Sequence, residues 1–212
     1  MTIRTSGPHA TNPPAVVWPA PSGDCTTVGT MSEVSDRYRV VADGFTARVA
    51  GVPADRWEVG TPCTDWTVRD LVAHVINTHR RVIASLDGTE VPDVDSTGDL
   101  LSQWSDASVD VAAALADPDR AATVSTGMFG EQSFESLVGR LVVSDTLVHT
   151  WDLARATGQD EALDPGAVSK SMEFLEPIDD AIRRPGGFAP KITPPPGADE
   201  QTRFLSFCGR PA

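Results

Sequence analysis

Residues 139–158 read GRLVVSDTLVHTWDLARATG, and their apolar positions recur with the three- and four-residue spacing of a helix. At roughly 100° per residue, one stripe of this helix carries charged as well as apolar side chains. Its apolar members are Phe134, Leu137, Val138, Leu141 and Val148, and Asp145, His149 and Asp152 fall on the same stripe. A carboxylate that points inward without a partner costs several kcal/mol. The stretch therefore predicts a buried helix whose titratable side chains share a cation, a proton or a metal.

The composition is typical of one soluble globular domain. A chain of 212 residues can bury a sizeable core, and 40% hydrophobic with 22% charged residues are ordinary proportions. No apolar run approaches the roughly 18 residues that a membrane span requires. The net charge of −13, without any cluster of lysines and arginines, argues against a phosphate-backbone partner. We expect neither a membrane nor a nucleic-acid partner.

The cysteines suggest a reducing compartment. There are three, Cys25, Cys63 and Cys208, and no two of them form a CxxC pair. This usage predicts neither a disulfide framework nor a cysteine-rich zinc site. We therefore expect the protein to be cytoplasmic.

The first 30 residues differ from the rest of the chain. They are rich in proline, serine, threonine and glycine and lack apolar periodicity, which predicts a disordered tail. A helical pattern begins directly after Met31, which is therefore a candidate for the natural start. We expect one domain over residues 31–212, with a C-terminal extension from about residue 160.

Apolar spacing predicts four long helices in this domain. They run from Val34 to about Gly51, from Thr67 to about Leu86, from Leu100 to Leu115, and from about Ser133 to Thr157. The interval Ala121–Gln132 is expected to be a loop with a short extended piece. Shorter helices are expected over Pro165–Arg183, bent at Pro177, and over Glu200–Phe207. The fold class is thus all-α, an up-down four-helix bundle with a short helical C-terminal extension.

Asp145 and His149 stand one helical turn apart on one face, the spacing that lets two side chains bind one ion. A third ligand must come from another element, and the remaining histidines are His9, His74 and His79. His9 lies in the tail. His79 falls near the centre of the second helix's apolar stripe, so periodicity alone favours it as the third ligand. His74 lies outside the stripe's edge, where it could still reach an open end of the bundle.

Each candidate also has a structural interpretation. Asp145 and His149 could form a buried hydrogen-bonded pair without any metal. For His79 the favoured interpretation is a core histidine. Asp152 could orient a ligand histidine, or it could pair with Arg155 in the last turn of the helix.

Two tryptophans and one cysteine near these positions have similar alternatives. Trp66 and Trp151 are expected to pack in the core rather than to form a substrate platform. Cys63 precedes a helix N-terminus, which would favour a thiolate, but an inert buried thiol is the favoured interpretation.

Two motifs together resemble a known family. They are TPCTDWTVRDLVAH over Thr61–His74 and DTLVHTWDLARATG over Asp145–Gly158, and they are followed by the closing segment Phe204–Arg210. This pattern resembles the actinobacterial DinB-like metal-binding family related to the N-terminal domain of mycothiol-dependent maleylpyruvate isomerase. The similarity runs from about Met31 to the C-terminus. It implies a DinB-like bundle that holds a divalent metal, with zinc expected, through His74, Asp145 and His149.

The resemblance also suggests a function. In the related isomerase the metal works with the low-molecular-weight thiol mycothiol, and a cationic metal lowers the pKa of a bound thiol. Our leading hypothesis is a mycothiol-dependent metalloenzyme that performs thiol transfer to, or thiol-assisted isomerisation of, a small electrophile, as a monomer or homodimer. The isomerase has glutamate where this chain has the shorter Asp145, and it has an additional C-terminal domain, so its substrate is not carried over.

Two alternatives remain. In the first, a non-catalytic metal-binding or sensing protein uses the metal structurally. A closed coordination shell would favour that alternative, whereas a cavity beside the metal would favour the enzyme. In the second, a metal-assisted hydrolase would use Asp152 as its general base.

Overall fold

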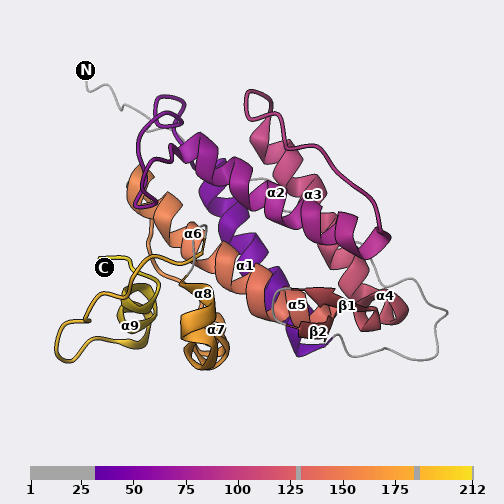
Figure 1. Ribbon diagram of the computed structural model, residues 1–212. Helices are drawn as coiled ribbons and strands as arrows, with labels where there is room; N and C mark the ends of the chain where they lie inside the picture. The colour runs from indigo at the N-terminus through magenta and orange to yellow at the C-terminus, as the bar shows by residue number, and fades with distance from the viewer. Residues whose placement is uncertain (1–31, 128–129, 184–186, 212) are drawn as a thin grey trace, which may run out of the picture.

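The computed structural model describes residues 32–127, 130–183 and 187–211, so the expected tail lies outside the described residues. The main body is built from α1 (Glu33–Ala50), α2 (Val68–Asp87), α3 (Leu100–Ala116) and a fourth, continuous helix. This fourth helix consists of α5 (Phe134–Leu137), the π-helical turn η1 (Val138–Val142) and α6 (Val143–Thr157). Both α1 and α2 pack against α3 and α6 (Figure 1). The predicted all-α bundle is confirmed.

The ends of the long helices follow from local sequence. Ser32 caps α1 by accepting the backbone N–H of Ser35 at 3.1 Å. Thr67 and Asp70 form a capping box at the start of α2. The second and fourth helices end at Gly88 and Gly158, whose φ angles of 64° and 71° suit glycine. Local hydrogen bonds therefore account for most of the predicted boundaries.

The fourth helix is more deeply buried than its sequence pattern indicates. Between residues 143 and 154 every residue is buried except Asp145, which is half-buried. Leu147 and Trp151, which lie off the expected stripe, are 2% exposed, whereas Leu137 and Leu141 within it are only partly buried. The turn η1 adds a residue to one turn of the helix, so a single wheel does not describe both halves. The single-stripe prediction is therefore wrong for α6, which is buried nearly all round.

The interval Ala121–Gln132 holds more regular structure than expected. It contains the end of α4 (Pro118–Ala122) and an antiparallel hairpin of β1 (Val124–Gly127) and β2 (Gly130–Ser133). Val124 is 61% exposed, so these strands bury little apolar surface. Apolar periodicity cannot detect strands of this kind, because it reports burial.

The C-terminal extension packs onto the bundle. The expected helix Pro165–Arg183 is divided into α7 (Pro165–Leu175), the 3₁₀ turn η2 (Glu176–Ile178) and α8 (Asp179–Ile182). The division falls at Pro177, which has no backbone N–H to continue an α-helix. The last helix, α9 (Glu200–Phe207), forms as predicted, and α7 packs against both α6 and α9 (Figure 1). Among the helices that the structure describes, none has the length and apolar character needed to cross a membrane.

Candidate metal centre

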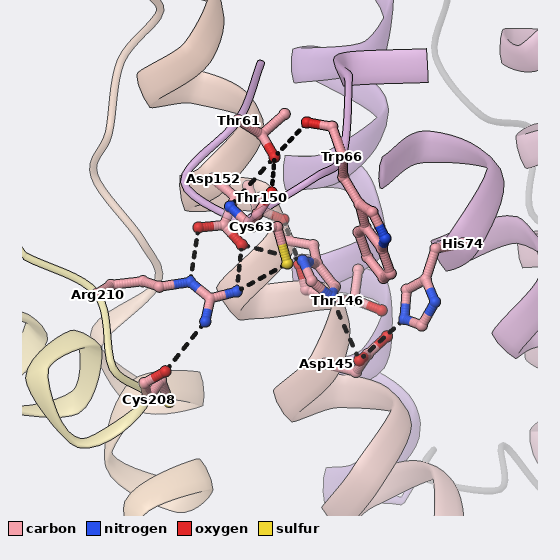
Figure 2. A network of polar contacts seen from close by, with 11 residues as sticks. Thr61, Cys63, Trp66, His74, Asp145, Thr146, Thr150, Asp152, Cys208 and Arg210 are labelled. Atoms are coloured by element: carbon pink, nitrogen blue, oxygen red, sulfur yellow. Dashed lines mark hydrogen bonds and ion pairs between the residues drawn. The ribbon is translucent and has the colours of Figure 1, made fainter. Parts of the chain in front are cut away.

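The three ligand residues implied by the resemblance meet between α2 and α6. His74 comes from the first half of α2, and Asp145 and His149 come from α6. The Nε2 atoms of His74 and His149 each lie 3.5 Å from Oδ1 of Asp145. One donor atom from each residue lies within 4.8 Å of the other two. Figure 2 shows Asp145 facing His74 across the gap between the two helices.

His79 lies in the core and takes no part in this cluster. Its side chain is fully buried, its Nδ1 donates to the carbonyl of Val75 at 2.8 Å, and its ring stands edge-on to Trp104 at 4.7 Å between centroids. Burial disfavours the charged ring and lowers the pKa of His79 to about 4. The core-histidine interpretation is confirmed, and the preference of periodicity for His79 as the third ligand is not supported by its position.

The geometry around His149 requires a positive charge between it and Asp145. Its Nδ1 lies 3.0 Å from Oδ2 of Asp152, and a carboxylate can only accept there, so Nδ1 carries a proton. In a neutral ring Nε2 would then direct a lone pair at the Asp145 carboxylate. An imidazolium proton or a metal cation between the two removes this repulsion.

The pKa shifts reflect the same electrostatics. Burial by itself lowers the pKa of His149, but the Asp145 and Asp152 carboxylates outweigh it and raise that pKa to about 9. Burial by itself raises the pKa of Asp145, but the charge and hydrogen bonds of His149 and the contact with His74 bring it well below its ordinary value. The carboxylate is thus ionised and strongly attracts a cation.

These residues fit a divalent metal. Oδ2 of Asp145 is buried and has no hydrogen-bond partner among the described residues, although a carboxylate in such a place normally has one. Two imidazole nitrogens and one carboxylate are a donor set that zinc takes in proteins. A cation bound by both oxygens of the Asp145 carboxylate would also satisfy Oδ2.

A buried ion pair lies on the Nδ1 side of His149. Asp152 is fully buried, and Arg210 grips both of its carboxylate oxygens, with Nε 2.9 Å from Oδ1 and Nη2 2.7 Å from Oδ2. Of the two interpretations of Asp152, the one in which it orients His149 agrees with this geometry. The alternative, a pairing with Arg155, is not formed, since Arg155 instead lies 3.4 Å from Glu161.

Sequence reasoning gave Arg210 no role. It follows Gly209, whose φ of 78° turns the chain after α9, and its side chain returns into the protein so that only 6% of the residue is exposed. Nη1 also donates to the carbonyl of Cys208 at 3.0 Å. Asp152 was the residue that could have pointed to Arg210. An inward carboxylate on a buried helix needs a cation from elsewhere in the chain.

The loop before α2 covers the cluster. Thr61 holds it together by donating from Oγ1 to the carbonyl of Trp66 at 3.1 Å, and the Trp66 ring packs on His74 at 4.6 Å between centroids. Sγ of the half-buried Cys63 lies 3.4 Å from Nη2 of Arg210 (Figure 2). Burial raises the pKa of the Cys63 thiol although Arg210 opposes that shift, which favours the inert-thiol interpretation.

Comparisons with known proteins agree with this arrangement. The model of the mycothiol maleylpyruvate isomerase N-terminal domain matches residues 38–154. The uncharacterized proteins MT0763 and Rv0738, from two strains of Mycobacterium tuberculosis, are each 33% identical over 170 residues, which is 77% of this chain and 91% of theirs. No solved structure matches the chain significantly. The segment matched by the family model contains all three candidate ligands, whereas Arg210 lies outside it.

Proposed function

The chain belongs to the family of the mycothiol maleylpyruvate isomerase N-terminal domain, and from this premise we propose that it is a mycothiol-dependent metalloenzyme. In this proposal His74, Asp145 and His149 hold a divalent metal, with zinc the expected ion. The reaction class is thiol transfer to, or thiol-assisted isomerisation of, a small electrophile. The observation that carries metal binding is the convergence of two imidazole Nε2 atoms on a carboxylate whose second oxygen has no partner among the described residues.

The exposure of the three ligands supports an accessible metal. The side chains of His74 and Asp145 are 32% and 28% exposed, whereas that of His149 is 8% exposed. Three protein ligands leave zinc with at least one open position, as catalytic sites do. Zinc bound here would lower the pKa of a thiol in that position, so that a thiolate exists at neutral pH.

The residues of this chain would hold the centre in one geometry. Asp145 has a shorter arm than the glutamate of the isomerase, yet its Oδ1 lies 3.5 Å from both histidines, so the shorter arm still reaches between them. Asp152 fixes the ring of His149 through the bond to Nδ1. Trp66 packs on His74 and limits the positions that its ring can adopt.

The alternative is a non-catalytic protein in which the metal is structural or reports metal status. One observation favours it. A hollow of about 600 Å³ lies beside η1, and its lining includes Arg37, Arg140 and Phe174 but none of the three ligands. This hollow therefore does not adjoin the proposed metal.

Thiol binding to the metal-loaded protein distinguishes the two candidates. We expect purified protein to bind one zinc ion per chain, and the cobalt-substituted protein to gain sulfur-to-metal charge-transfer absorption when mycothiol is added. The same experiment on Cys63→Ser excludes a protein thiolate as the source of the signal. If the protein binds one metal ion per chain but its cobalt spectrum does not change when mycothiol is added, the result would support the structural alternative. Protein that binds no metal would refute both candidates.

A further inference from the structure

His149 lies between two groups of metal-binding atoms. Its Nε2 faces Asp145 and His74, as described above. On the other side of the ring, Sγ of Cys63, a ring nitrogen of His149 and an oxygen of Asp152 also lie within 4.8 Å of one another. Thiolate, imidazole and carboxylate are all zinc ligands. The donor atoms alone would therefore allow a cation on either side of the ring.

Arg210 fills the second position with a permanent cation. Its guanidinium contacts both oxygens of Asp152 and lies 3.4 Å from Sγ of Cys63. A guanidinium stays protonated under all ordinary conditions and presents its donors in a rigid fork that matches a carboxylate. The Asp152 charge on the Cys63 side of His149 is thus already neutralised, and the Arg210 guanidinium occupies the space that a metal would need there.

The closing segment of the chain is built to keep Arg210 there. The backbone N–H of Arg210 donates to the carbonyl of Leu205 at 2.8 Å. Phe204 and Leu205 are themselves fully buried in the core. A Cβ at Gly209 would lie 2.7 Å from the Cβ of Ala189, so the turn before Arg210 is closely packed as well. The guanidinium is therefore held by the fold rather than by its ion pair alone.

We propose that Arg210 is a positioning residue that directs the metal to the His74 side of His149. It neutralises Asp152, keeps that carboxylate on the Nδ1 proton of His149, and so leaves Nε2 as the coordinating atom while it blocks the Cys63 side. The inference rests on the proposed metal binding. Because Arg210 lies outside residues 38–154, the centre of the family domain is completed here by the C-terminal extension.

Replacing Arg210 with methionine tests this role. Arg210→Met retains an unbranched side chain of similar reach but removes the guanidinium that contacts Asp152 and Cys63. We expect its zinc affinity, measured by competition with a chelator, to fall by about 10- to 100-fold. Its cobalt form should gain sulfur-to-metal absorption without any added thiol, because Cys63 can lose its proton to solvent and coordinate. That absorption should disappear in Arg210→Met/Cys63→Ser.

Arg155→Met is the matched control. Arg155 is an exposed arginine on α6 that also contacts the C-terminal segment, with Nη2 3.4 Å from the carbonyl of Pro211, but it does not touch Asp152. Its replacement should leave zinc affinity and the cobalt spectrum unchanged. Equal losses in Arg155→Met and Arg210→Met would overturn the inference, because they would indicate a general effect of the C-terminal segment.

The remaining outcomes separate this inference from the proposed function. If wild-type protein binds zinc and Arg210→Met binds it equally well with no Cys63 signal, only the inference fails. If wild-type protein binds no metal, the proposed function fails and the inference with it. Should Arg210→Met not fold, the measurement moves to Arg210→Lys, which keeps the charge but loses the fork. A drop of about threefold or more in zinc affinity is then expected, and wild-type affinity would overturn the inference.

Discussion

Replacing the two histidines of α2 one at a time separates metal binding from stability. His79→Ala is expected to destabilise the fold and to leave zinc binding intact. The imidazole of His79 is fully buried, and its ring stands edge-on to Trp104 and 5.8 Å from Tyr38 between centroids. Alanine would leave a cavity between these two aromatic side chains.

The size of the effect follows from two opposing contributions. Truncating a buried side chain of this size to alanine costs about 2–4 kcal/mol through lost contacts and the cavity. Nε2 of His79 is buried without a hydrogen-bond partner among the described residues, and removal of such an atom recovers about 1 kcal/mol or more. We expect a net loss of about 2 kcal/mol, which for a chain of 212 residues lowers Tm by about 4–8 °C.

His74→Ala should give the reverse result. The side chain of His74 is 32% exposed, and its polar contact among residues 32–127, 130–183 and 187–211 is the 3.5 Å approach to Asp145. We therefore expect a change below about 1 kcal/mol in the metal-free protein. The zinc content should fall from one ion per chain to none.

Metal analysis after dialysis, together with calorimetry of the metal-free proteins, measures both effects. If His79→Ala loses zinc while His74→Ala keeps it, the assignment of the two histidines is wrong.

Three further predictions test the fold. The buried His79 has a pKa of about 4 against about 6.5 in the unfolded chain, so its contribution to stability is complete above pH 6.5 and falls by about 3 kcal/mol as the pH drops to 4. Urea unfolding between these pH values should show the loss, with a flatter profile in His79→Ala. In thermal unfolding, Gly44→Ala should raise Tm, because alanine favours a helix over glycine and nothing lies within 4 Å of the added Cβ. Gly139→Ala should instead cost about 1–3 kcal/mol, because its Cβ would lie 2.9 Å from a valine methyl. Thr46→Val should cost about 1–3 kcal/mol, since the indole N–H of Trp104 donates to Thr46 Oγ1 at 2.8 Å, and Thr46→Ser should restore most of it.

The parts of the fold that sequence predicted are those set by local interactions. Helix ends at Thr67 and Gly158 depend on one capping side chain or on one glycine, and both can be read from neighbouring residues. The turn η1 was missed because Val138 and Val142 are buried in it as they would be in an α-helix. The hairpin β1–β2 was predicted only as a short extended piece, because its short strands stay largely outside the core.

The proposed third ligand, His74, could not be chosen from periodicity for a physical reason. A helical wheel ranks residues by depth of burial, and the deepest polar residue of α2 is His79, whose Nδ1 is already bonded to Val75. A residue that holds a metal with an open position must instead lie near the edge of the core, where solvent and ligand can reach it. His74 meets that condition. The family resemblance indicated His74, because the spacing of a motif reflects where a residue lies in the fold and not how deeply it is buried.

The charges around His149 also bear on which ligand the centre would accept. Without a metal, the two carboxylates Asp145 and Asp152 are balanced by the Arg210 guanidinium and by one imidazolium proton on His149. A divalent cation in place of that proton would leave one surplus positive charge in a partly buried place, where an unbalanced charge is costly. A neutral water molecule in the open position does not remove this surplus, whereas a thiolate or a hydroxide formed from metal-bound water does. Because Arg210 is fixed by the fold and cannot lose its charge, its guanidinium does not relieve this surplus at any ordinary pH. The pairing of Asp152 with Arg210 therefore favours an anionic ligand at the proposed metal, and a thiolate is one ligand that meets this condition.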